Sequence, residues 1–571
     1  MSKLGDQRLR LIVALSLVAF LIVAGRAVQL QVVEASSLAA KVSQQQEARI
    51  TLPASRASIV DDSGRPLAVM EMAEDLMVHP AQVTNPVTTA DFIAHMEGIK
   101  KAKALRREVA RLEALLQPKG VTQAIVLRQA SPDLVRAILR RHPAGLFSVP
   151  EPRREYPFGR LAPQLLGYTD INNVGQGGLE QQYNRYLEGH PGKELQIMGP
   201  GQVPLETVTL RRPQPGHQVR LTLDQVVQSK VQAVMNQTAA QWHAHSATAI
   251  VLDPRSGDIL AMVSSPSYNN NEVHNLTAAQ FEHMSQNEPT NYTYEPGSTF
   301  KVVTMTAALT AGIVYPEMKF ANLPYEIHVG DRWIHDDAPR GPKTFTAAQI
   351  LAQSSNVGTI TIAQMVGKTL LSHWINRFGF GQLSQLRFPG ESPGIVLPPE
   401  KWYSSSIGNI PIGQGISVTP LQMASMYATI ANHGVLVQPH VVSKIDGVKL
   451  PPPTRRRIIG PHVDGELVNM LEGVVDSALG TGVLANIPGY SVAGKTGTAQ
   501  KANGQGGYST TNYVASFVGF LPAHNPRVEV LVVVDSPRGN IYGGSVAAPA
   551  FKTIGSFLTQ VLSIPPDRPL H

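Results

Sequence analysis

The chain has 571 residues, too many for one ordinary hydrophobic core, so two or more domains are expected. The absence of cysteine excludes disulfides and thiolate metal or redox chemistry. The net charge of +7 is scattered along the chain and accompanies no recognition motif, which argues against a nucleic-acid-binding protein.

An apolar segment near the N-terminus follows three basic residues. The uncharged run 11–25 rises only about 22 Å as a helix, but continuation to Val33 reaches the roughly 30 Å of a hydrocarbon core. The basic residues before it and Glu34 after it put the N-terminus in the cytoplasm. We expect an uncleaved anchor; the alternative is a signal peptide cleaved near Ala35-Ser36-Ser37.

The region from 38 to 216 carries no cluster of titratable residues, and we expect it to have a structural, positioning role. Residues 56–68 predict a β-hairpin, and 92–116 predict one amphipathic surface helix. The glycines of 175–178 lack dinucleotide-binding spacing and indicate a turn before a helix. The proline-rich stretch 201–216 predicts an interdomain linker.

The remaining residues alternate between strands and helices. A helix capped by Asp224 comes first, and a helix over 549–562 closes the chain. Between them, apolar, β-branched runs predict the strands of one antiparallel sheet, at 247–252, 258–263, 513–520 and 528–534. An antiparallel sheet with helices at its start, middle and end is an α+β fold.

Three short motifs occur in order, each at the boundary of an element. The turn at 295–297 puts a serine in the first turn of a helix, where free N–H groups collect, with a lysine three residues on. The other two motifs follow a short helix and open a strand. Each is weak by itself, but the ordered set in one domain is strong; the motifs are Ser298-x-x-Lys301, Ser354-x-Asn356 and Lys495-Thr496-Gly497.

This set resembles that of the penicillin-binding proteins and serine β-lactamases, and more of the chain is similar to the class B penicillin-binding proteins. The similarity extends from the apolar segment to about residue 560. Residues 494–500 and 513–519 resemble the division (septal) branch more than the elongation branch. One departure is Ala57, where the family usually has glycine. The segments that carry the resemblance are 56–68, 177–180, 294–301, 412–415 and 542–544.

The resemblance implies an α+β protein with an N-terminal membrane helix, an elongated mixed pedestal domain and a penicillin-binding transpeptidase domain. We expect a cytoplasmic tail at 1–10 and a transmembrane helix at 11–33. The pedestal, a dimerisation-type domain, then covers 34–216 and the transpeptidase domain 217–571. This arrangement implies a single-pass protein of the inner membrane with its catalytic domain on the periplasmic face.

The resemblance also implies a serine-type D,D-transpeptidase of the D-Ala-D-Ala carboxypeptidase class. Such an enzyme cross-links peptidoglycan stem peptides on lipid II-derived glycan strands during septum formation, and β-lactams acylate it. Implied partners are a membrane-embedded lipid II polymerase and other division proteins. Alternatives are an elongation-type transpeptidase, a β-lactam hydrolase or sensor, and a scaffold with a decayed site.

The chemistry of the motifs follows from their side chains. Ser298 must lose a proton to attack a carbonyl, and no histidine stands near it in the sequence. Lys301 can act as the base only if its pKa falls, through burial or a neighbouring cation, which Lys495 would supply. We therefore expect Lys301 to be neutral and Lys495 to be charged.

The remaining motif residues suit proton transfer and substrate binding. Ser354 can relay a proton to the leaving group, and Asn356 can hydrogen-bond Lys301 and the substrate backbone. Gly497 lets a peptide lie close as an added strand, with Thr496 and Thr498 beside it. By resemblance, Thr498 binds the substrate carboxylate, and the N–H groups of Ser298 and Thr498 form the oxyanion hole.

Two histidine-containing segments could supply metal ligands. His243 and His245 lie near the end of a helix without a carboxylate partner. His335-Asp336-Asp337 lies in a polar loop that resembles a family segment near the cleft. We expect no metal and no cofactor.

Overall fold

The computed structural model describes residues 3–35, 47–117, 120–141, 143–198, 204–504 and 507–569. The chain divides into two compact units. The first consists of Met1–Arg56 and Glu188–Gly216, and the second of Ala57–Leu187 and His217–His571.

The first unit begins with a long apolar helix. Helix α1, Lys3–Val28, continues as a single π-helical turn over Gln29–Val33. Residues Arg8–Val33 are long and apolar enough to cross a membrane once. This agrees with the predicted anchor at 11–33. Part of the alternative cleavage site, Ser36 and Ser37, lies outside the described residues.

The first unit also contains an antiparallel sheet of three strands in the order β1-β8-β9. Part of the predicted linker at 201–216 is one of these strands, so that prediction is wrong for 204–211. Pro204 is the first residue of an edge strand, a position where a missing N–H costs nothing. The strands are Glu47–Leu52, Gly192–Met198 and Pro204–Arg211.

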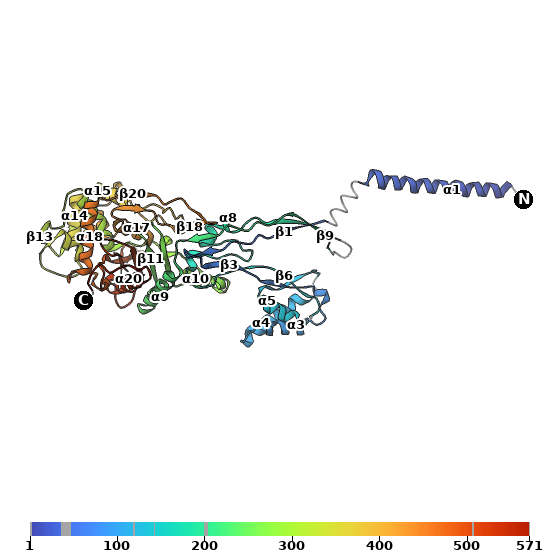
Figure 1. Ribbon diagram of the computed structural model, residues 1–571, viewed down its shortest axis with the longest axis horizontal. Coiled ribbons are helices and arrows are strands. Elements are labelled where there is room, and N and C mark those ends of the chain that lie inside the picture. Colours follow the sequence, from blue (N-terminus) through green and yellow to red (C-terminus); the bar gives the residue numbers. More distant parts are fainter. Residues whose placement is uncertain are drawn as a thin grey trace. The chain divides into compact units, whose positions relative to one another are not determined.

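The second unit is built on a fully antiparallel five-stranded sheet in the order β12-β11-β23-β22-β21. Helices cover both of its faces, which is why strand β23 is buried at every residue (Figure 1). The predicted α+β fold is confirmed. The strands are Ile259–Ser265, Ser246–Leu252, Val528–Asp535, Tyr508–Leu521 and Ala493–Ala502.

Two hydrophobic clusters pack against this sheet, one on each face. Helices α9 (Gln225–Gln241) and α20 (Ala548–Val561) cover one face. Helices α12 (Lys301–Thr310) and α17 (Pro420–Ala431) contribute to the cluster on the other. As predicted, Asp224 caps α9 by accepting hydrogen bonds from Val226 and Val227 N–H.

A second, mixed sheet joins strands from both stretches of this unit, in the order β19-β18-β10-β2-β3-β7. Strand β10 pairs parallel to β2 across the predicted domain boundary at 216, which stays a prediction. The predicted hairpin at 56–68 is confirmed as β2 and β3. The strands are Val448–Lys449, Val442–Ile445, Val219–Leu221, Ile59–Val60, Pro66–Glu71 and Arg153–Glu155.

A smaller α/β portion of this unit packs three helices on the sheet β5-β4-β6 (Figure 1). The single helix predicted over 92–116 is wrong, because two helices cover that stretch. Gly98, with φ +73°, adopts a left-handed conformation just after α3 ends. The helices are Pro86–Met96, Ala102–Leu116 and Pro132–Leu139, and the strands Ala124–Ala130, Glu74–Val78 and Leu146–Pro150.

A buried ion pair ties the start of β2 to helix α7, Gly178–Gln182. Arg154 Nε donates to Glu180 Oε1 at 2.7 Å, and Arg154 Nη1 donates to Ala57 O at 2.8 Å. Ala57 is not among the residues with positive φ, so alanine fits where the family usually has glycine. Helix α7 follows the glycine turn, as the sequence predicts.

Candidate active site

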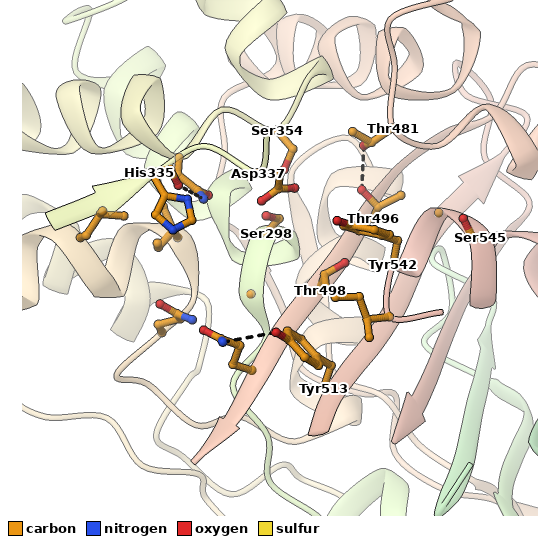
Figure 2. Close-up of a pocket in the computed structure, with 18 of the residues that line it drawn as sticks. Ser298, His335, Asp337, Ser354, Thr481, Thr496, Thr498, Tyr513, Tyr542 and Ser545 are labelled. Atoms are coloured by element: carbon orange, nitrogen blue, oxygen red, sulfur yellow. Dashed lines mark hydrogen bonds between the residues drawn. The ribbon is translucent and has the colours of Figure 1, made fainter. Parts of the chain in front are cut away.

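The serine turn lies against the edge strand β21 of the five-stranded sheet. Gly297 has φ +56°, and a Cβ on it would approach Thr498 O to 2.8 Å. Gly297 N donates to Gly413 O at 3.0 Å, and a Cβ on Gly413 would meet Gly297 O at 2.1 Å. These contacts leave no room for side chains, and they hold the half-buried Ser298 at the cleft (Figure 2).

Lys301 connects the first two motifs. It is the first residue of α12 and is 1% exposed. Its Nζ donates to Ser354 O at 2.5 Å, to Ser354 Oγ at 3.2 Å and to Asn356 Oδ1 at 2.7 Å. Among the described residues, Ser298 is not one of its acceptors, so the expected Ser298–Lys301 contact is not formed here.

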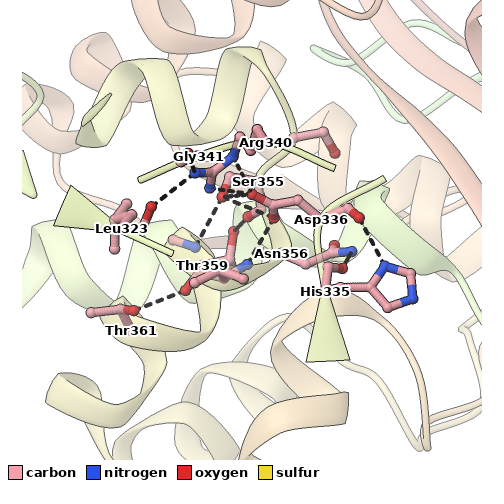
Figure 3. Close-up of polar contacts among 12 residues, drawn as sticks. Leu323, His335, Asp336, Arg340, Gly341, Ser355, Asn356, Thr359 and Thr361 are labelled. Carbon is pink, nitrogen blue, oxygen red and sulfur yellow. Dashed lines mark hydrogen bonds and ion pairs between the residues drawn. The ribbon is translucent and has the colours of Figure 1, made fainter. Parts of the chain in front are cut away.

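A polar loop before the second motif holds that motif in place (Figure 3). Asp336 is 7% exposed and accepts hydrogen bonds from Val357 N at 3.0 Å and from Ser355 Oγ at 3.1 Å. Asn356 Nδ2 donates to His335 O at 2.9 Å. The carboxylate of Asp336 therefore fixes the start of helix α14, Asn356–Val366, and with it the acceptors of Lys301.

This positioning role of Asp336 is not among the sequence predictions, which consider His335-Asp336-Asp337 as a metal site and as a loop near the cleft. The signal was present: an acidic pair in a polar loop, ahead of a helix whose first N–H groups need acceptors. Arg340 completes the loop, with Nε 3.1 Å from Asp336 Oδ2. In the part of the chain that the structure describes, no three metal-ligand side chains come together.

Strand β21 presents alternate residues to the cleft. Thr496, Thr498 and Gln500 line it, whereas Lys495 and Gly497 belong to the opposite, buried face. Thr496 Oγ1 lies 2.7 Å from Thr481 Oγ1, and Thr498 Oγ1 accepts from Gly543 N at 3.2 Å. Both threonines thus face the cleft, a point that strand alternation by itself left open.

The need for glycine at 497 has a different cause from the one expected. A Cβ there would lie 2.3 Å from Ser516 Oγ and 3.0 Å from Pro296 O. These atoms belong to the neighbouring strand and to the serine turn, so Gly497 allows the turn to pack against β21. It does not clear space on the cleft side.

The two motif lysines lie close enough to influence each other's protonation. Burial lowers the pKa of Lys301 to about 8, while Asp337 and Asp336 raise it. Burial, and then the charge of Lys301, lower the pKa of Lys495 well below its usual range. Among the described residues, the hydrogen bonds of Lys495 Nζ are the two long ones to Thr496, at 3.3 and 3.4 Å.

The three acceptors of the Lys301 amine and the two nearby carboxylates favour charge on Lys301, whereas burial and the charge of Lys301 disfavour charge on Lys495. These contacts favour charge on the lysine that the sequence predicts to be neutral, and the protonation states themselves stay a prediction. The expectation counted the lysines but not their acceptors or the two carboxylates.

The cleft has a volume of about 630 Å³ and lies beside the edge strand β21. The hairpin β14–β15, over Glu326–Val329 and Arg332–His335, supplies part of its wall. Aromatic side chains at its margin include the exposed Trp333 and Tyr542. A free strand edge next to a serine can take an extended peptide as an added strand and present its carbonyl to that serine.

Two family models match this chain. The penicillin-binding protein transpeptidase domain matches residues 247–556, and the penicillin-binding protein dimerisation domain matches residues 51–221. The chain belongs to the class B penicillin-binding proteins, which combine these two domains.

Individual relatives are similar over almost the whole chain. Peptidoglycan D,D-transpeptidase FtsI of Escherichia coli K12 is 32% identical, over 98% of this chain and 92% of its own length. The probable peptidoglycan D,D-transpeptidase PbpC of Pseudomonas aeruginosa is 32% identical, over 99% and 97%. The crystal structure of penicillin-binding protein 3 of Mycobacterium tuberculosis with aztreonam is 28% identical, with a TM-score of 0.70 over 91% and 99%.

Proposed function

We propose that this chain is a membrane-anchored peptidoglycan D,D-transpeptidase that cross-links stem peptides during septal wall synthesis. The observation that carries the proposal is the set of contacts from Lys301 to Ser354 and Asn356 beside Ser298. The similarity to FtsI, named a peptidoglycan D,D-transpeptidase, supports the reaction type.

In the first step Ser298 Oγ attacks the carbonyl carbon of the penultimate D-alanine of a stem peptide. The serine proton passes to a lysine amine, the C–O bond forms and the C–N bond to the terminal D-alanine breaks. Ser354 relays a proton to the leaving amine, which departs as free D-alanine. Backbone N–H groups of Ser298 and Thr498 stabilise the oxyanion, each worth about 3 kcal/mol.

The resting protonation state sets a condition on this step. Lys301 must release its proton before it can accept that of Ser298, and a pKa of about 8 leaves about a tenth of it neutral at pH 7. The anionic carboxylate of the bound substrate favours the charged form of a nearby lysine, so we propose that Lys495 takes up the positive charge once the substrate binds. Substrate binding thus moves the charge from Lys301 to Lys495.

In the second step the amine of a neighbouring stem peptide attacks the ester carbonyl, the new C–N bond forms, the C–O bond to Ser298 breaks, and the proton lost by the amine returns to Ser298 Oγ. Water in place of that amine gives the carboxypeptidase reaction, so the enzyme class depends on which acceptor reaches the ester. A β-lactam is opened by Ser298 in the same way, but its leaving nitrogen stays attached. We place this chemistry on the periplasmic face of the inner membrane, beside a lipid II polymerase.

Labelling of the full-length protein with a fluorescent penicillin tests the proposal. Ser298→Ala should abolish covalent labelling while thermal unfolding stays unchanged, and Ser545→Ala, a serine elsewhere in the cleft, should still label. Undiminished labelling of Ser298→Ala would refute the assignment. Rapid turnover of the drug would point to a hydrolase, and a dispersed rather than midcell fluorescent fusion would overturn the septal role.

A further inference from the structure

A second cavity, of about 310 Å³, lies within the second compact unit and apart from the catalytic residues. One wall comes from Gln164 to Gly167 and from helix α7. The other comes from helices α10 (Ala278–Met284) and α11 (Glu288–Asn291) with residues 388–390. The glycine segment 175–178, for which the sequence predicts a turn before a helix, thus forms part of a cavity.

Backbone packing forms part of the wall of this cavity. A Cβ on Gly167 would lie 1.8 Å from Gly177 O, and a Cβ on Gly178 would lie 2.5 Å from Gly167 N. Both glycines have positive φ. The chain at 167 and at 177–178 therefore packs without intervening side chains, and the side chains on either side of it surround the cavity.

The lining has a consistent chemistry. It contains aromatic rings and carboxamides but no aspartate, glutamate, lysine, arginine or histidine. The rings of Tyr168 and Phe281 meet edge to face at 5.5 Å. The aromatic residues are Tyr168, Tyr268, Phe281 and Phe388, and the carboxamides are Gln164, Gln176, Gln181, Asn287 and Asn291.

One of these amides, that of Gln164, forms part of the wall and has an unused acceptor oxygen. Gln164 is 5% exposed, and its Nε2 donates to Pro266 O at 3.0 Å and to Met284 O at 2.8 Å. No donor among the described residues reaches its Oε1. This oxygen is not one of the fully buried unpaired oxygens and remains accessible, so a hydroxyl or N–H group of a ligand can donate to it.

We propose that this second cavity binds an N-acetylated sugar unit of the glycan strand whose stem peptide reacts at Ser298. The inference rests on the proposed function. A pyranose ring has an apolar C–H face for the aromatic rings, and hydroxyl and acetamido groups for the carboxamides. An anionic ligand would find no cation here, and a hydrocarbon would leave the amides unpaired.

The position of the cavity along the chain fits this role. Helix α11, which lines the cavity through Asn291, runs directly into the segment 292–297 that forms the serine turn. A glycan bound at α11 therefore contacts a helix that leads directly into the serine turn.

The test uses the full-length protein in detergent, first acylated with penicillin so that the catalytic cleft is blocked. The probe is a β-1,4-linked tetramer of N-acetylglucosamine, followed by saturation-transfer NMR and calorimetry. We expect the acylated protein to bind the tetramer. Phe281→Ala and Gln181→Ala should each weaken binding at least tenfold, whereas Phe158→Ala, an exposed ring outside the cavity, should not.

Several outcomes would overturn the inference: no binding, loss of binding on acylation, equal binding by all variants, or preferential binding of a proline-rich peptide in the cavity. Gln181 is exposed on α7, so its variant keeps the test valid if Phe281→Ala does not fold. With polymeric glycan strands, both variants should raise KM, while kcat on a short stem peptide stays constant. Penicillin labelling reports separately on the proposed function, so the two failures are distinguishable.

Discussion

Close glycine contacts shape both the active-site cleft and the second cavity. The polar groups at the cleft include charged ones, whereas those of the cavity are neutral. In each, glycines bring two stretches of backbone into direct contact, at Gly297 and Gly413 in the cleft and at Gly167 and Gly178 in the cavity. Two buried lysines and two carboxylates lie beside the cleft, whereas the lining of the cavity contains neutral amides and rings and no charged side chain.

This difference separates chemistry from recognition. Groups whose pKa lies near the working pH can give and take protons, and burial is what brings a lysine there. Carboxamides do not titrate, so the cavity can bind a ligand without reacting with it. The following predictions test this contrast, beginning with the largest effect.

Replacement of Lys301 should have the largest effect. Lys301→Met removes the amine and should slow acylation by a fluorescent penicillin about 1000-fold, within the range for general base catalysis. Lys301→Arg should be no better, because guanidinium stays protonated. The observed rate constant of labelling measures this. Arginine activity near that of the native protein would contradict a role for a neutral amine.

The pH profile of acylation should reflect the same residue. Burial lowers the pKa of Lys301 to about 8. The neutral form grows as the pH rises, so the second-order rate constant should rise about tenfold per unit below that pKa and level off above it. A rate that is flat from about pH 6 to 9 would show that no titrating base is involved.

The variant Asp336→Ala tests whether the pH profile of acylation reflects Lys301. Loss of the acceptor of Val357 N frees the 354–356 turn, and a misplacement of about 1 Å can cost about 100-fold in rate. Because Asp336 raises the pKa of Lys301, the variant should also move the midpoint of the pH profile lower. Asp331→Ala, in the exposed turn of the cleft hairpin, is the control. A slower rate with an unmoved midpoint would indicate a purely structural role.

The ion pair beside the second cavity should affect stability but not acylation. Arg154→Met removes the cation that donates to the buried Glu180 at 2.7 Å and should lower the free energy of unfolding by about 3–5 kcal/mol. Arg153→Met breaks a partly exposed pair with Glu71 and should cost no more than about 1 kcal/mol. Denaturant unfolding measures both. A change in the labelling rate of folded Arg154→Met would show that the region around this ion pair is coupled to the active site.

Local patterns predicted the elements well where neighbours in sequence decide the structure. The hairpin at 56–68, the cap at Asp224 and the strands of the five-stranded sheet follow from turn residues, capping and β-branched runs. Two predictions failed. Gly98 divided a predicted helix, and the linker predicted at 201–216 contributed strand β9, which pairs with the strand just before it in the chain, β8.

The same distinction between local patterns and distant contacts applies to the active site. The identity and order of the three motifs were visible in the sequence, because each is a short run at an element boundary. The loop at Asp336 was not, because its meaning depends on contacts with residues 355–357, about 20 positions later.

The sequence by itself determined which groups the cleft contains: a serine at a helix start, two lysines, a serine–asparagine pair and two strand threonines. Tertiary structure decided the surroundings of the two lysines. A lysine's protonation depends on its burial and on acceptors that come from distant segments, and these acceptors favour charge on Lys301. It also brought the glycine turn at 177–178 and helix α10 together into a cavity, which no local pattern could reveal.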